Sequence, residues 1–230
     1  STDSTQWGSK LNSGEKVKPT YTQNENGYLN EWTFAYGVNI SNVLNLGASI
    51  GIQSLDYSSS TSYQEDFADG GGYRINNEFN SSGTGVNFKI GTIIRPADFL
   101  RIGASLHTPT YFDLTDIHSA KISSDVYGTY SSSTPVVSSD YQLEGPMQYN
   151  LSLAFIFGKI GLLSADYNIS DYSGMKLRSK SGSPTDFSDE NQDIKTNLNS
   201  VQTFRIGGEV KLDKGFSLRA GFASTLNNAT

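Results

Sequence analysis

The chain has 230 residues, a formal net charge of −6 at pH 7 and a pI near 4.9. This balance supplies no basic stripe to neutralise phosphates, so nucleic acid is not expected as a partner. The absence of cysteine excludes disulfide frameworks, thiolate metal sites and cysteine nucleophiles. No stretch approaches 18 consecutive apolar residues, which excludes a transmembrane helix. The mean hydropathy of −0.41 does not exclude a membrane barrel, because barrel strands alternate lipid-facing and lumen-facing residues.

In chain order, residues 1–28 are polar and are predicted to be the end of a long loop. Period-2 alternation then recurs to the end of the chain and indicates eight β-strands in four pairs. Short turns such as SNVLN, PADF and GK join the two strands of each pair. The predicted strands are 31–40 and 46–57, 85–95 and 100–110, 148–157 and 160–170, and 201–212 and 216–223.

The connections between the pairs are long and rich in Ser, Gly, Asp and Tyr: residues 58–83, 111–147 and 171–200, with 225–230 beginning another. Strict alternation of short turns and long loops is typical of outer-membrane barrels, which have short periplasmic turns and long extracellular loops. The predicted fold is therefore all-β, an antiparallel up-and-down transmembrane β-barrel. A soluble all-β protein is the alternative.

Parity assigns the faces of the strands. Trp32, Phe34 and Tyr36 share one face of the first strand, and the face formed by such residues should meet lipid. The polar face should line the lumen, with Lys89, Arg101, His107, Asp166, Arg205, Glu209 and Arg219. A sandwich whose polar face meets water would show the same alternation.

Three stretches resemble hairpins of the FadL/TodX family of outer-membrane transporters: GVNFKIGTIIRPADFLRIGASLHTPT, EGPMQYNLSLAFIFGKIGLLSADYNISDYSGMKL and TFRIGGEVKLDKGFSLRAGFA. The first carries an "RP" turn followed by an "LRxGAS" strand. The resemblance covers about residues 29–224.

The resemblance implies a barrel of about fourteen strands, with these eight as the fourth to eleventh and a hatch and lateral opening outside this chain. It implies passive transport of hydrophobic molecules, fatty acids or aromatic compounds, through the bacterial outer membrane. Residues 1–28 would be the end of an extracellular loop, 29–224 barrel strands and loops, and 225–230 the start of a further extracellular loop.

No catalytic constellation is recognisable, so we expect no enzyme, no cofactor and no metal. The histidines, His107 and His118, have no nucleophile motif near them. The glycine-rich run at 69–73 does not lead from a strand into a helix, so it is read as a mobile loop rather than a phosphate cradle. The acidic pairs at 65–66 and 189–190 could bind Ca²⁺ or bridge lipopolysaccharide, but solvated loop acids are the simpler interpretation.

Apolar side chains in the first two long loops are the candidate ligand-binding residues: Phe67, Tyr73, Ile75, Phe79, Tyr111, Phe112, Leu114 and Ile117. By the family resemblance, these loops are where hydrophobic ligand is first captured. Alternatively, the same side chains pack the loops on each other or form the outer aromatic girdle.

Three functions are compatible with the sequence. The first is passive transport of hydrophobic small molecules. The second is a barrel that serves as an anchor or cargo-binding component of a secretion or surface-protein assembly. The third is a soluble β-rich binding module. The expected partners are a hydrophobic ligand, outer-membrane lipid or lipopolysaccharide and a protein at the extracellular loops.

Overall fold

A computed structural model describes residues 16–68, 70–126, 128–180, 185–212 and 215–227. Within these ranges the chain forms twelve β-strands and one α-helix. They are β1 (Lys18–Ile40), β2 (Leu44–Asp66), β3 (Gly72–Ala97), β4 (Leu100–His107), β5 (Tyr111–Ser124), β6 (Tyr130–Ser133), β7 (Val137–Glu144), β8 (Met147–Phe157), β9 (Gly161–Asp171), β10 (Lys176–Ser179), α1 (Ser188–Asn197), β11 (Ser200–Lys211) and β12 (Ser217–Asn227).

The chain divides into two compact units. Of the described residues, those within 16–27, 57–81 and 116–139 form the small unit, and those within 28–56, 82–115 and 140–227 form the large unit.

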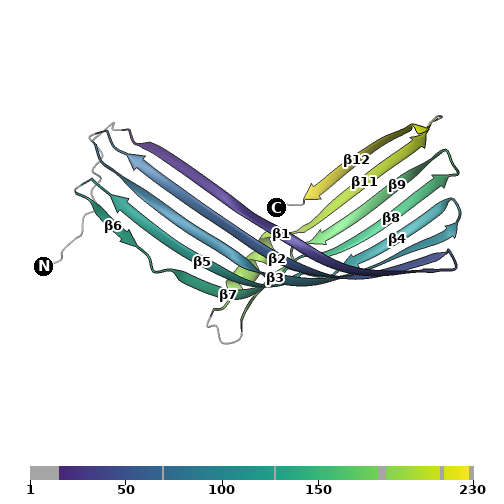
Figure 1. Cartoon of the computed structure of the whole chain (residues 1–230), viewed down its shortest axis with the longest axis horizontal. Helices are drawn as coiled ribbons and strands as arrows, with labels where there is room; N and C mark the ends of the chain where they lie inside the picture. The colour runs from purple at the N-terminus through teal and green to yellow at the C-terminus, as the bar shows by residue number, and fades with distance from the viewer. Residues whose placement is uncertain (1–15, 69, 127, 181–184, 213–214, 228–230) are drawn as a thin grey trace. The chain divides into compact units, whose positions relative to one another are not determined.

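The large unit contains all eight predicted strands, and each pairs with its neighbour in the order β1-β2-β3-β4-β8-β9-β11-β12. Every pair with an assigned register in this series is antiparallel. Figure 1 shows β4, β8, β9, β11 and β12 side by side in this order. The predicted all-β, up-and-down fold is confirmed. Among the strands that the structure describes, no pairing joins β1 to β12, so each has one open edge.

The turn between β1 and β2 shows how local sequence sets a hairpin. Ser41 and Asn42 have φ of 53° and 57°, and the amide of Val43 donates to the carbonyl of Ile40 at 3.1 Å. Positive φ at both central residues identifies a type I′ turn, whose twist matches that of paired strands. The side chain of Asn39 also accepts from the Asn42 amide at 3.0 Å.

The strands reach further into the predicted loops than their apolar alternation indicates. β1, β2 and β3 contain 23, 23 and 26 residues, more than twice the nine to eleven that a tilted membrane crossing needs. The extensions carry Ser, Thr, Asn and Tyr on both parities, so no apolar pattern marks them. Part of residues 1–28 is strand as well, since β1 begins at Lys18; residues 1–15 and 228–230 lie outside the described residues.

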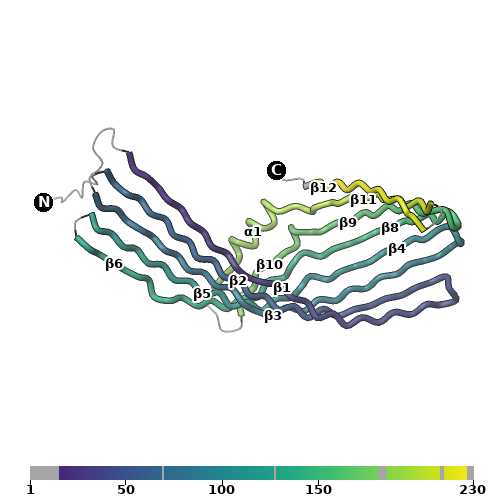
Figure 2. The backbone as a smooth tube through the Cα atoms, turned by 45° about the horizontal axis from the view of Figure 1, so that its top comes forward, coloured from purple at the N-terminus to yellow at the C-terminus, as the bar shows by residue number. Residues whose placement is uncertain are grey.

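The small unit is formed by these extensions together with β6, which pairs with β5 in antiparallel register from Lys121 opposite Ser133 to Ser124 opposite Tyr130. In the large unit, the third long connection contains β10 and α1, which Figure 2 shows next to each other. Asn191 of α1 fixes this contact, because its side chain bonds both the amide and the carbonyl of Leu177 at 2.8 Å.

A conventional core is absent from the described part of the chain, where Leu114 is the single buried hydrophobic residue. By contrast, many large apolar side chains of β1, β8, β11 and β12 are exposed. No helix in the described ranges is long and apolar enough to cross a membrane.

Candidate functional site

The strand register shows that one face of the large unit is apolar from β3 to β12. Cross-strand partners lie on the same face of a sheet. One row of successive partners is Ile94, Ile102, Leu153, Ala165, Ile206 and Phe222. The aromatics of this parity are exposed rather than covered by a second sheet, as Tyr36 (79%) and Phe88 (51%) show.

The opposite face is polar in the same register. One row of partners is Gly91, Ser105, Asn150, Asn168, Thr203 and Thr225, and a second is Lys89, His107, Gln148 and Ser170. All seven residues predicted to line a lumen lie on this face, Asp166 opposite Arg205 and Glu209 opposite Arg219. In the registers assigned from β3 to β12, no strand is slipped by one residue, which would have moved its side chains to the wrong face. That this face encloses a lumen remains a prediction.

A hydrogen-bonded cluster around Glu31 occupies one end of the polar face. The Glu31 carboxylate forms an ion pair with Lys89 and accepts hydrogen bonds from the side chains of Thr33 (2.8 Å), Gln53 (2.5 Å) and Asn87 (3.3 Å). We call these five residues the Glu31 cluster. Because they come from β1, β2 and β3, the cluster ties three strands together.

The Glu31 cluster depends on a glycine in β2. A Cβ on Gly51 would lie 2.7 Å from Oδ1 of Asn87 and 2.9 Å from the Glu31 carboxylate. Sequence reasoning placed Lys89 on the polar face but did not pair it with Glu31. The sequence shows that the two opposite charges share a parity and that the strand between them carries a glycine, but the alignment that brings them into contact comes only from the structure.

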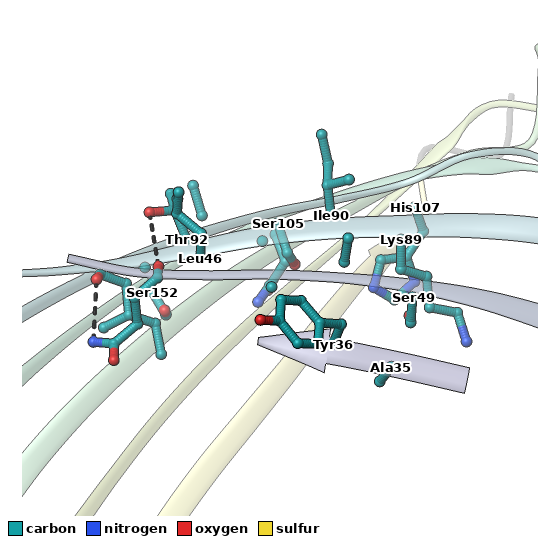
Figure 3. A pocket seen from close by; sticks show the side chains of 18 residues that line it. Ala35, Tyr36, Leu46, Ser49, Lys89, Ile90, Thr92, Ser105, His107 and Ser152 are labelled. Carbon is teal, nitrogen blue, oxygen red and sulfur yellow. Dashed lines mark hydrogen bonds between the residues drawn. The ribbon is translucent and has the colours of Figure 1, made fainter. Parts of the chain in front are cut away.

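Two adjoining cavities lie beside the cluster. The first has a volume of about 530 Å³, and Figure 3 shows Lys89, His107 and Ser49 gathered at one end of it and Ser152 toward the other. The second, of about 310 Å³, is lined by Ser105, His107, Gln148, Asn150, Asn168 and Arg205. Since both cavities share Ser105, His107 and Asn150, they form one groove along the polar face, lined by residues of seven strands from β1 to β11.

The small unit brings several predicted ligand-binding aromatics together. The rings of Tyr57 and Phe79 lie 6.2 Å apart, those of Tyr63 and Tyr73 lie 6.1 Å apart, and Phe67 lies 6.2 Å from Tyr73. These five residues form an aromatic row along the β2–β3 hairpin. They are half-buried.

Hydrogen bonds fix two of the tyrosines in the row. The Tyr57 hydroxyl donates to Glu25 at 2.7 Å, and the Tyr63 hydroxyl donates to Glu65. Donation to a carboxylate stabilises the neutral phenol. The hydrogen bond to Glu65 accordingly raises the pKa of Tyr63 to about 12.

Of the remaining predicted ligand-binding residues, Ile75 has the same strand and parity as Tyr73 and Phe79 and so shares a face with this row. The other four, Tyr111, Phe112, Leu114 and Ile117, come from β5. In the large unit, Leu114 is buried and packs on β3, where a Cβ on Gly83 would lie 2.9 Å from its side chain. Phe112 lies against Gly85 in the same way, since a Cβ on Gly85 would lie 2.6 Å from its ring. Tyr111 and Ile117 are exposed, whereas Ile75 is half-buried. The packing of Leu114 and Phe112 favours the loop-packing interpretation for these two.

A further cavity, also of about 530 Å³, lies at the β2–β3 turn of the small unit. Phe67 and Tyr73 line it, but its other walls are Gly, Ser, Thr, Asp, Gln and Arg residues. Within the described residues, no group of three His, Asp or Glu side chains could hold a metal ion.

Solved structures identify the fold. The chain is similar to the toluene transporter TbuX of Ralstonia pickettii, with a TM-score of 0.60 and 17% identity over 89% of this chain and 57% of that one. It is also similar to the toluene transporter TodX of Pseudomonas putida, with a TM-score of 0.43 and 10% identity over 93% and 74% of the two chains. No protein-family model and no curated protein matches the sequence. The resemblance read from the sequence is thus confirmed at the level of the fold, and the chain spans little more than half the length of TbuX.

Proposed function

We propose that this chain is part of an outer-membrane β-barrel that carries hydrophobic small molecules passively across the bacterial outer membrane. The observation that carries the proposal is the two-faced sheet of the large unit, with an exposed apolar face and a hydrogen-bonded polar face in one continuous register. In a bilayer the first face would meet hydrocarbon and the second would line the lumen.

The exposure of the apolar face argues against a soluble β-rich module. A soluble sandwich covers such a face with a second sheet about 10 Å away. Here Trp32, Tyr36 and Phe222 are 72%, 79% and 64% exposed. Soluble monomers rarely expose contiguous apolar patches of this size, and such patches mark membrane or protein contact sites. Because the row from Ile94 to Phe222 crosses six neighbouring strands, the apolar contact surface extends over all six.

The class of ligand is proposed from the fold and from the small unit together. TbuX, which shares the fold, is a toluene transporter. The aromatic row of the small unit offers a surface on which a hydrophobic ligand, an aromatic compound or a fatty acid, could first bind. Apolar area buried there would contribute about 25 cal/mol per Å². In this proposal Ile75 and Phe79 contact ligand, and the groove along the polar face of the large unit faces the lumen.

A transport assay tests the proposal in the complete protein that contains this chain, produced in a bacterial host without a transporter of its own. Uptake of radiolabelled toluene and of a long-chain fatty acid is measured at matched surface expression. We expect Phe79→Asp to lower uptake several-fold, since an unpaired carboxylate in an apolar surface must be desolvated. Asn80→Asp is the matched control, because this neighbouring residue has the opposite parity and is exposed.

Heat-modifiable migration in a denaturing gel serves as the control for barrel assembly. An assembled Phe79→Asp variant that takes up both compounds like wild type would refute the capture surface. If the wild-type protein itself transports neither compound while residing in the outer membrane, the transport proposal fails and an anchor or cargo-binding role takes its place.

A further inference from the structure

The turn between β2 and β3 carries a groove that shares Phe67 and Tyr73 with the aromatic row but is otherwise lined by different chemistry. Of the twelve residues that line this cavity of about 530 Å³, two are aromatic and the others are glycine or polar. A pocket for a hydrocarbon should be lined mostly by apolar side chains. We propose that this groove binds a saccharide.

Three planar polar side chains in the groove form a fixed chain of hydrogen bonds. Arg74 donates to Oε1 of Gln64 through Nε at 3.1 Å and through Nη2 at 2.5 Å, and Gln64 in turn donates to Asp66 at 2.6 Å. Each group is therefore held in place before any ligand binds, which lowers the entropy cost of recognition. The chain still presents guanidinium donors at one end and carboxylate acceptors at the other.

On the far side of the groove, Asp125 accepts a hydrogen bond from the backbone amide of Gly72 at 2.7 Å. This bond holds a second carboxylate beside the turn. Gly70 and Gly71 have φ of 87° and 89°, a region that glycine adopts without strain. The turn is closed by hydrogen bonds from the Phe67 amide to the Gly71 carbonyl at 3.0 Å and from the Gly70 amide to the Phe67 carbonyl at 3.2 Å.

The two aromatic rings complete the recognition chemistry. Phe67 and Tyr73 are inclined to each other by 45° and line the same groove. A sugar ring has an apolar C–H face that packs on an aromatic ring, while its adjacent hydroxyls both donate and accept hydrogen bonds. Guanidinium, amide and carboxylate groups held at fixed positions match pairs of such hydroxyls. Neither a hydrocarbon nor a bare cation would use this combination.

The source of the saccharide rests on the proposed function, because a hairpin outside the outer membrane lies among the sugars of lipopolysaccharide. The binding of a saccharide by the groove does not depend on the proposed function. Free sugars or glycans of other cells carry the same chemistry, so the experiment has to separate the two sources.

The test uses the complete protein purified in detergent. Saturation-transfer NMR and calorimetry measure binding of the core oligosaccharide released from lipopolysaccharide by mild acid, and of maltose, lactose and chitobiose. We expect Arg74→Ala and Asp66→Asn each to weaken binding about tenfold, as for one lost charge-assisted hydrogen bond. Arg95→Ala, which removes an arginine paired with Asp98 in the large unit, is the matched control.

Binding of the core oligosaccharide alone supports the proposal with lipopolysaccharide as the source, and binding of the disaccharides as well supports free sugars. Binding of none of them, or equal binding by wild type and an assembled Asp66→Asn variant, overturns it. Toluene uptake should be unchanged in the Arg74 and Asp66 variants, so failure of the saccharide site is distinguishable from failure of transport.

Discussion

The Glu31 cluster predicts a measurable coupling between two charges on different strands. Glu31 on β1 and Lys89 on β3 are 24% and 29% exposed at their side chains, so water screens the pair in part. Lys89→Met leaves Glu31 with the side chains of Thr33, Gln53 and Asn87, and we expect a loss of about 1–2 kcal/mol in the free energy of unfolding.

Glu31→Gln should cost more, about 2–3 kcal/mol, because it weakens several charge-assisted hydrogen bonds at once. The double variant should then lose about 1 kcal/mol less than the sum of the two single losses, since the second substitution no longer breaks the ion pair.

Urea unfolding of the complete protein in lipid vesicles measures these values, and the fluorescence of Trp32, next to Glu31 in β1, reports the transition. The Arg95–Asp98 pair serves as the control cycle. Its carboxylate is 98% exposed, and its coupling should stay below about 0.5 kcal/mol. Additive losses at Glu31 and Lys89 would refute the reasoning and reduce the cluster to a set of independent contacts.

Three further outcomes are expected. Leu153→Arg, on the apolar face, should destabilise the assembled barrel by about 2–4 kcal/mol, whereas Ser152→Arg on the polar face should cost much less; equal losses in urea unfolding would contradict a lipid-facing role. Tyr63 should ionise near pH 12, visible at 295 nm as a step that Tyr63→Phe removes. Because the pKa of Tyr63 is raised in the folded state, the stability that its bond to Glu65 contributes is present below about pH 10 and is lost as the pH rises through about 12. The free energy of unfolding of the Tyr63→Phe variant should therefore depend less on pH in that window than that of the wild type. An unchanged pH profile would contradict this. Gly83→Ala should impair assembly, since its Cβ would overlap the carbonyl of Asp113, and normal heat-modifiable migration would contradict this packing.

Much of the large unit was predictable because its residues alternate. Trp32, Phe34 and Tyr36 on one parity, and Lys89, Asp166 and Arg205 on the other, indicated both strands and faces. The register from β3 to β11 confirms that the three charged residues share a face. The turn between β1 and β2 was also predictable from the sequence, since the short polar residues Ser41 and Asn42 suit a tight hairpin. The strand extensions of the small unit were missed, because Ser, Thr and Tyr there follow no apolar period and cross-strand contacts such as Thr61 to Asn77 define them instead.

The sequence by itself determined which side chains share a face, because in a strand that follows directly from a period of two. Only the tertiary structure decided which of those side chains meet. The contact of Glu31 with Lys89, 58 positions away, depends on how β1 and β3 are staggered across β2 and on the space left by Gly51. Likewise, the burial of Leu114 against Gly83 depends on the stagger of β5 on β3. A one-dimensional pattern carries no information on stagger, since every even shift of one strand along another leaves the faces unchanged.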